Sequence, residues 1–227
     1  MDENKNKNKN KNKNKNKNKN KNININIKMT SRKCYVLTCD ENSARAQFSK
    51  NVLKKVGFEV IFFHAIPNDD KVLSNKESMI CIYNIIANTT NTENNWTYVF
   101  EDDINVIEDI YLDEIIKYEN ISNFFFYLGL CNYGSAKNQL HELKINNNNV
   151  TIVNGNIRGL HAIGLSKIGA SELLKFCKQS TENYMDIILE QFSMKHPANV
   201  VRYDLESYIH NHKGIFYQDR NRFPSTI

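Results

Sequence analysis

The stretch Trp96-Thr-Tyr-Val-Phe-Glu-Asp-Asp-Ile-Asn105 joins a short apolar run directly to three consecutive carboxylates. Trp96 to Phe100 has the length of a strand, and its aromatic and β-branched residues suit a pleated, covered surface, so this run predicts a buried strand. Glu101, Asp102 and Asp103 then fall at the carboxyl end of that strand, the edge at which open α/β sheets bind ligands. Side chains alternate along a strand, which predicts that Glu101 and Asp103 point one way and Asp102 the other.

Three adjacent acids repel one another unless a positive charge compensates them. A divalent cation meets this requirement, because carboxylate oxygens are the hard ligands that magnesium and manganese prefer. Such ions are commonly held between one or two carboxylates and the phosphates of a substrate. The alternative is a solvated acidic turn, since most charged runs lie at the surface. The triplet therefore predicts either a metal-phosphate site or an exposed turn.

Strand signals alternate with helix signals on both sides of this stretch. Apolar and β-branched runs predict further strands at residues 34–38, 59–63, 124–128, 161–165 and 200–203. Caps and helical spacing predict helices from Asn42 or Ser43 to about Val56, where Gly57 is a stop signal, and at residues 76–88, 110–118, 167–179 and 184–194. This alternation favours parallel strands with right-handed crossovers, so we expect an α/β/α sandwich with a mostly parallel central sheet.

The amino-terminal segment, residues 1–28, consists largely of a Lys-Asn repeat with no apolar face to bury. Such a tract cannot offset the entropy of ordering, so we expect a disordered tail, followed by a single domain over residues 29–227. Ten lysines against Asp2 and Glu3 give the tail +8, and because the whole chain carries +5, the remainder carries −3. Contact with nucleic acid or a membrane is therefore expected only through the tail, in a salt-dependent form.

Hydropathy and cysteine usage indicate the compartment. No apolar run approaches the roughly 20 residues of a membrane span, and the amino terminus lacks the apolar core of a signal peptide. The five cysteines are scattered and form no Cys-x-x-Cys pair, which is typical of reduced, mostly buried thiols. We expect a cytoplasmic protein with no transmembrane segment, in the host cytoplasm if the chain is viral.

Several further motifs accompany the acidic triplet in order along the chain. They are Cys34-Tyr-Val-Leu-Thr-Cys-Asp40 with Arg45 shortly after it, Phe62-Phe-His-Ala65, the strand that ends in Glu101-Asp-Asp-Ile104, the run Gly159-Leu-His-Ala-Ile-Gly-Leu-Ser-Lys-Ile-Gly-Ala-Ser-Glu-Leu-Leu174, and Asp186. Over about residues 33–192 this series resembles glycosyltransferase family 25, the lipopolysaccharide and collagen β-galactosyltransferase group. One departure is Glu77-Ser78-Met79, where the family commonly carries Ser-His, so only Ser78 matches.

The resemblance implies a GT-A-type, Rossmann-like fold and a metal-dependent transfer of sugar, with inversion, from a nucleotide sugar to a hydroxyl group of a glycan or protein. We expect Mn²⁺ or Mg²⁺ as cofactor and a UDP-sugar as donor. Asp103 is the expected principal metal ligand, and Glu101 reaches the metal or the ribose. Asp102 belongs to the donor site as a supporting or helix-capping residue. Arg45 is a candidate for binding the diphosphate.

Three further residues are assigned on the same basis. Asp186 is the expected base on the acceptor hydroxyl, although an acid in the first turn of a helix is also explained by the helix dipole alone. His210 and His212 are candidate metal ligands, because GT-A enzymes often bring a late histidine to the metal. Two histidines two residues apart in a loop are also typical of solvated side chains. For Arg45 the alternative is a surface helix residue.

Three other functions stay open at this point. A degenerate family member would bind sugar nucleotide or glycan without turnover. Another metal-phosphate enzyme, such as a nuclease or phosphatase, would need more carboxylates on neighbouring strand ends, for which Asp40 is the candidate. A polyanion-binding protein would act through the basic tail.

Overall fold

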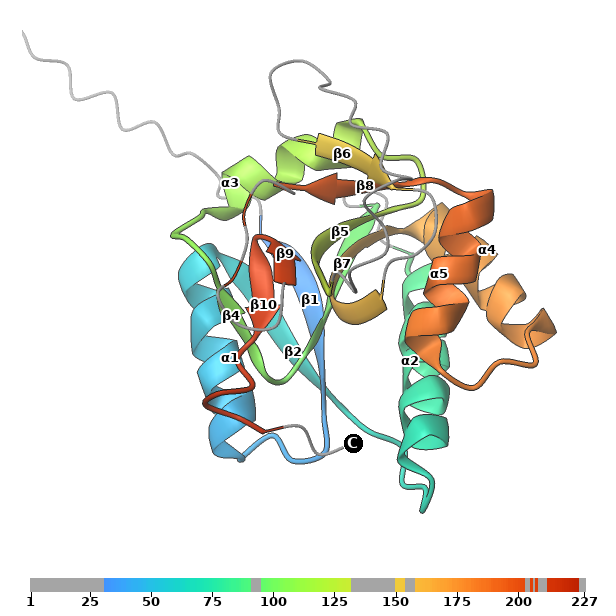
Figure 1. The fold of residues 1–227 in the computed structure, drawn as a ribbon, viewed down its shortest axis with the longest axis horizontal. Helices are drawn as coiled ribbons and strands as arrows, with labels where there is room; N and C mark the ends of the chain where they lie inside the picture. The colour runs from blue at the N-terminus through green and yellow to red at the C-terminus, as the bar shows by residue number, and fades with distance from the viewer. Residues whose placement is uncertain are drawn as a thin grey trace, which may run out of the picture. The chain divides into compact units, whose positions relative to one another are not determined.

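The central element of the structure, a computed structural model, is an eight-stranded sheet (Figure 1). The structure describes residues 31–90, 95–131, 150–153, 158–202, 205, 207 and 212–224, so the predicted tail and His210 lie outside the described residues. Across the sheet the strands are β2 (Phe58–His64), β1 (Arg32–Thr38), β3 (Trp96–Glu101), β7 (Arg158–Ser166), β5 (Phe125–Cys131), β8 (Ala198–Val201) and β6 (Val150–Val153), with β9 (His212–Gly214) paired to β5. Strands β1, β2, β3, β5 and β8 run in one direction, and the other three run against them.

Helices cover both faces of this sheet. Helix α1 (Ala44–Val56), α3 (Leu112–Ile115) and the 3₁₀ turn η1 (Ile116–Asn120) pack on one apolar cluster. Helices α2 (Lys71–Ala87), α4 (Lys167–Gln179) and α5 (Met185–Lys195) pack on the other. Alternate residues of β3 enter the two clusters, since Val99 belongs to one and Phe100 to the other. The expected layered α/β arrangement with a mostly parallel sheet is confirmed, and it is compatible with a Rossmann-like fold.

Local signals explain where the helices begin and end. Ser43 caps α1 by accepting a hydrogen bond from the Ala46 N–H at 3.2 Å, and Gly57 ends it in the left-handed conformation at φ 117°. Helix α2 begins five residues before the predicted start, because Asp70 accepts from the N–H groups of Val72 and Leu73. The predicted helix over residues 110–118 is confirmed only in part, since one α-helical turn, α3, forms there and continues as the 3₁₀ turn η1.

The predicted parallel order fails at one strand. Strand β7 lies antiparallel between β3 and β5. The sequence predicts no helix between β5 and β7, and parallel neighbours usually need a crossover connection that contains a helix. As a result, the amino end of β7 meets the carboxyl ends of β1, β3 and β5 at one edge of the sheet.

A second, two-stranded sheet was not predicted. Strand β4 (Ile104–Val106) begins directly after the acidic triplet and pairs antiparallel with β10 (Phe216–Gln218), which places Gln218 opposite Ile104. The carboxyl-terminal segment is therefore attached to the chain beside the acids. Among the described residues, no helix combines the length and hydrophobicity of a membrane span.

Candidate functional site

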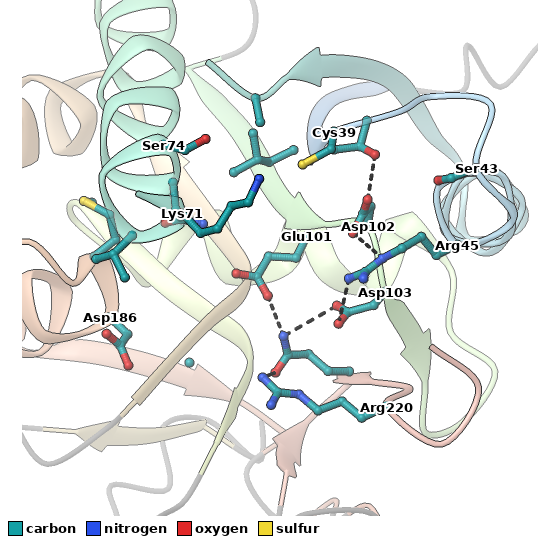
Figure 2. A pocket seen from close by; sticks show the side chains of 18 of the residues that line it. Cys39, Ser43, Arg45, Lys71, Ser74, Glu101, Asp102, Asp103, Asp186 and Arg220 are labelled. Atoms are coloured by element: carbon teal, nitrogen blue, oxygen red, sulfur yellow. Dashed lines mark hydrogen bonds and ion pairs between the residues drawn. The ribbon is translucent and has the colours of Figure 1, made fainter. Parts of the chain in front are cut away.

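A pocket of about 580 Å³ opens at the edge of the sheet where these strand ends meet (Figure 2). Its lining includes the end of β1 and the residues after it, the acidic triplet at the end of β3, the first turns of three helices, and the end of β10 with the residues after it. The lining residues are Leu37, Thr38, Cys39, Asp40, Ser43, Arg45, Ala65, Lys71, Val72, Ser74, Asn75, Glu101, Asp102, Asp103, Cys131, Gly159, Tyr184, Met185, Asp186, Gln218 and Arg220. Five predicted site residues therefore meet in this pocket: Arg45, Glu101, Asp102, Asp103 and Asp186.

Arg45 is paired with two of the three acids. Its Nε lies 2.7 Å from Asp102 Oδ1, and its Nη2 lies 3.1 Å from Asp103 Oδ2. Asp102 also accepts a hydrogen bond from the Thr38 hydroxyl at 2.6 Å. The alternative of a surface helix residue for Arg45 is wrong, because its side chain is only 19% exposed. A cation at the positive end of a helix is unfavourable by itself, and the two carboxylates offset that cost.

Gln218 contacts the other side of the triplet. Its amide nitrogen donates to Glu101 at 2.5 Å and lies 3.5 Å from Asp103 Oδ1. Glu101 and Asp103 thus share Gln218, whereas Asp102 and Asp103 share Arg45. Strand β3 ends at Glu101 and residues 102–103 form a turn, so the predicted strand alternation does not extend to Asp102 and Asp103. Arg220 donates to the Gln218 side-chain oxygen at 3.1 Å, so a second guanidinium lies beside the acids. The Nε of Arg220 is buried and has no hydrogen-bond partner in the described part of the chain.

Backbone contacts hold the triplet in place. The Asp219 N–H donates to the Asp103 carbonyl at 2.7 Å, which ties the carboxyl-terminal segment to the acids. The fully buried Ser49 of α1 accepts from the Ile104 N–H at 3.1 Å. The turn that carries Asp103 is therefore fixed from both sides, and Asp103 itself is only 2% exposed. The exposed-turn alternative for the triplet is excluded for this residue.

The acids are electrostatically crowded. Burial raises the pKa of Glu101 to about 8, with Asp103 and Asp102 adding to the effect and Arg220 and Arg45 opposing it. Burial also raises the pKa of Asp103, with Arg45 as the largest opposing influence. Near neutral pH, Glu101 therefore holds its proton unless a further positive charge arrives.

Asp186 lies on the far wall of the pocket, in the first turn of α5, and Figure 2 shows the acids between it and Arg45. Its Oδ1 accepts from the Ile187 N–H at 2.9 Å, and that N–H belongs to the first turn of α5, where backbone donors have no partner within the helix. The starts of α1 and α2 also reach the pocket, through Ser43 and Lys71. Three helix starts and several cations thus face one cavity, which favours an anionic ligand.

His212 lies in a different group of side chains. It is fully buried, so the alternative of a solvated histidine is wrong for it, and it lies beside His161 and Cys131. Burial lowers the pKa of His161 to about 3 and raises the pKa of Cys131 to about 12. The imidazole of His161 is therefore neutral and the thiol protonated in the absence of a ligand.

Ser78, which matches the serine of the Ser-His motif of glycosyltransferase family 25, forms hydrogen bonds with backbone groups of the protein. It is fully buried, accepts from the Ile66 N–H at 2.8 Å and donates to the Ser74 carbonyl at 2.6 Å. It does not line the pocket, whereas Ser74 does. The position that would carry the family's histidine is occupied by Met79, which is buried in the core.

The sequence matches no protein-family model and no curated protein sequence. Several lining residues were not predicted as site residues, namely Thr38, Lys71, Gln218 and Arg220. No local sequence pattern marks the last two, because Gln218 ends the three-residue strand β10 and Arg220 follows it.

Proposed function

We propose that this protein is a metal-dependent glycosyltransferase of the GT-A type, which moves a sugar from a nucleotide sugar to a hydroxyl group of a glycan or protein. The observation that carries the proposal is the convergence of three carboxylates and two arginines in one pocket at the carboxyl edge of a mostly parallel sheet. The resemblance of the motifs to glycosyltransferase family 25 supports the same reading. A UDP-sugar is the first donor to test.

The acidic cluster fits a hard divalent cation. Asp103 and Glu101 both contact Gln218, and their oxygens are the ligand type that Mn²⁺ and Mg²⁺ prefer. Burial, followed by the charges of Asp103 and Asp102, raises the pKa of Glu101, and a bound cation would oppose this effect. When bound, the cation would stabilise the negative charge that develops on the leaving diphosphate. Arg45 contacts Oδ2 of Asp103, whereas Oδ1 has a 3.5 Å contact with Gln218, so Asp103 and Glu101 would hold the ion.

The cations around the acids suit the nucleotide diphosphate. Arg45, Arg220 and Lys71 line the same cavity, and the starts of α1, α2 and α5 add partial positive charge. One guanidinium group can donate two parallel hydrogen bonds to two phosphate oxygens, and this bidentate contact would orient the leaving diphosphate. The cavity volume, about 580 Å³, is within the range of small-molecule sites.

Asp186 is the proposed base on the acceptor side. Its carboxylate accepts the proton of the acceptor hydroxyl while that oxygen forms the new bond to the sugar carbon and the bond to the diphosphate breaks. The diphosphate leaves with the electron pair, so a single displacement inverts the sugar carbon. The position of Asp186 across the cavity from Arg45 suits an acceptor that enters opposite the donor.

A second candidate is a binding protein that has kept the donor site without turnover. Two observations favour it: Arg45 already neutralises Asp102 and Asp103, and Met79 occupies the place of the family's histidine. This candidate predicts nucleotide-sugar binding without sugar release. Hydrolysis of nucleotides that carry no sugar would instead favour the metal-phosphate enzyme.

The test is a panel of nucleotide sugars, measured for melting-temperature shifts and for donor hydrolysis or transfer, with and without Mn²⁺. We expect a donor that stabilises the protein only with metal, and turnover that falls by about a hundredfold or more in Asp103→Asn, because the ligand charge is lost while the size is kept. Stability should not fall, since three crowded acids repel one another. Asp69→Asn, an exposed acid outside the pocket, is the matched control. Unchanged Mn²⁺-dependent turnover in Asp103→Asn rules out the metal assignment.

A further inference from the structure

A second group of metal-ligand side chains lies beside the candidate donor site. Cys131 on β5, His161 on β7 and His212 on β9 offer one sulfur and two ring nitrogens that all lie within 4.8 Å of one another. All three residues are buried, and Cys131 and His212 are direct partners in the β5–β9 pairing. The two imidazole rings have centroids 5.0 Å apart at an interplanar angle of 85°. Three strands that are distant in sequence therefore bring one thiol and two imidazoles together.

The tautomer of His161 follows from its hydrogen bond. Its Nε2 lies 3.3 Å from the Phe216 carbonyl oxygen, which can only accept, so Nε2 carries the hydrogen and Nδ1 carries a lone pair. Nδ1 is fully enclosed and has no hydrogen-bond partner among the described residues. A buried acceptor without a partner is costly and rare, and therefore needs an explanation. Metal-binding histidines commonly show this arrangement, with the second ring nitrogen donating to a carbonyl group.

Gly129 on β5 and Gly159 on β7 leave space for the His161 ring and the Cys131 thiol. At Gly159, with φ +95°, an added Cβ would lie 3.0 Å from Cys131 Sγ and 3.2 Å from His161 Nδ1, so the thiol and the lone pair face the same small space. At Gly129, an added Cβ would lie 2.6 Å from His161 Nε2 and would collide with the Phe216 carbonyl oxygen. Both positions thus require the absence of a side chain to keep the ring and the thiol together.

We propose that Cys131, His161 and His212 bind a borderline-soft transition-metal ion of the Zn²⁺ class, separately from the hard cation proposed for the acidic cluster. One thiolate and two imidazoles are ligands that zinc accepts, whereas Mg²⁺ and Mn²⁺ prefer oxygen. Tetrahedral zinc needs ligand atoms about 3.3–3.6 Å apart, so atoms that lie within 4.8 Å of one another have to approach by no more than about 1.2–1.5 Å. The ion takes the place of the thiol proton, which is released to solvent.

The ion has a structural role in this arrangement. It joins β9 to β5 and β7, and β9 leads directly into β10, which carries Gln218. The Gln218 amide oxygen lies 3.8 Å from Cys131 Sγ, while its nitrogen contacts Glu101. The metal would therefore fix the segment that positions Gln218 and Arg220 over the acids. The proposal does not depend on the transferase assignment.

The test uses Co²⁺ as a spectroscopic substitute for Zn²⁺ in the full-length protein after chelator treatment. We expect one equivalent of Co²⁺ to give a thiolate-to-cobalt charge-transfer band and the strong visible bands of an ion held by the three side chains and one solvent molecule, both removed by one equivalent of Zn²⁺. Cys131→Ser should lose the charge-transfer band, and His161→Gln should bind at least about tenfold more weakly, as loss of even an outer partner does. Cys177→Ser, another buried thiol outside the cluster, is the matched control and should keep the band.

Two outcomes overturn the proposal: no charge-transfer band in the natural protein, or a band that persists in Cys131→Ser. The absence of a band in the natural protein overturns the proposal even if a variant fails to fold. Circular dichroism of each variant without metal identifies a failure to fold. Asp103→Asn separates the two metal sites. It should lose Mn²⁺-dependent turnover and keep the Co²⁺ band, so either proposal can fail without the other.

Discussion

Glu101 links metal binding at the acidic cluster to pH. Its pKa is raised to about 8 by burial and by Asp103 and Asp102, and a carboxyl group has to lose its proton before it can ligate. We therefore expect Mn²⁺ affinity to rise between about pH 6 and pH 8 and to level off above that range. Calorimetric titration at several pH values measures this, and Glu101→Gln should flatten the dependence. An affinity that does not change with pH would contradict a role for Glu101 as a ligand.

The carboxyl group of Glu101 also affects folding stability in the absence of metal. Because the folded-state pKa of Glu101 lies above its unfolded value of 4.5, the folded state binds more protons between about pH 4.5 and pH 8. The contribution to stability is fully present below that window and is lost as the pH rises through it. The stability of Glu101→Gln should fall less over this range than that of the natural protein.

Asp186 offers a choice between two roles that one variant can decide. Asp186→Asn keeps an oxygen that can accept from the Ile187 N–H, so the helix start is preserved. If the carboxylate is the base, transfer should fall by about 10² to 10⁴-fold while donor and Mn²⁺ affinity stay nearly unchanged. If it only complements the helix dipole, stability should fall by about 0.3–1 kcal/mol and turnover should persist.

Asp113→Asn, an exposed acid in the first turn of α3, is the matched control for the dipole effect. A loss of donor affinity in Asp186→Asn would instead place Asp186 on the sugar.

At the residue scale, local patterns predicted the part of the site that lies close together in sequence. The acidic triplet was identified because it follows a strand directly, and Arg45 because it follows the first strand. Gln218 could not be found in this way, since it is 117 positions from Glu101 and its place depends on the β4–β10 pairing. His212 was predicted as a metal ligand, but its grouping with Cys131 and His161 was missed for the same reason, because the three residues lie on different strands.

At the element scale, Ser78 connects the loop after β2 to α2. Ser78→Ala removes the acceptor of the half-buried Ile66 N–H and the buried donor to the Ser74 carbonyl, which should destabilise the protein by about 1–3 kcal/mol. Mn²⁺ and donor binding by the folded variant should be unchanged, because Ser78 lies outside the pocket lining. Thermal unfolding with and without Mn²⁺ measures both quantities, with Ser171→Ala on α4 as the control. A large loss of turnover at unchanged stability would instead give Ser78 a direct functional role.

Elements with their own start and stop signals were predicted well, and elements defined by distant partners were not. Helix α4 was predicted to the residue, and α1 was predicted from Ser43 and Gly57. Strands β4 and β10 have three residues each, too few for a periodic pattern. The direction of β7 depends on the connection that precedes it, which a strand pattern does not contain.

At the scale of the whole molecule, charge divides the chain unequally. Residues 29–227 carry −3, and the acidic pocket lies in that part, whereas residues 1–28 carry +8 from ten lysines and two acids, within a total of +5. A negative domain repels polyanions on average, so any affinity of the full chain for heparin or nucleic acid has to come from the tail. Such binding should weaken steeply with salt, because lysine contacts to phosphate or sulfate release counterions.

Removal of the tail tests this division. A chain that starts at Met29 should melt at the same temperature as the full chain, because a lysine-asparagine repeat has no apolar surface with which to contribute to a core. Donor binding and turnover should also be unchanged, while retention on a heparin column at low salt should be lost. The matched control replaces the tail lysines with glutamine at equal length, which separates charge from chain length. A large drop in melting temperature after truncation would show that the tail docks on the domain, and loss of turnover alone would show that it binds the acceptor.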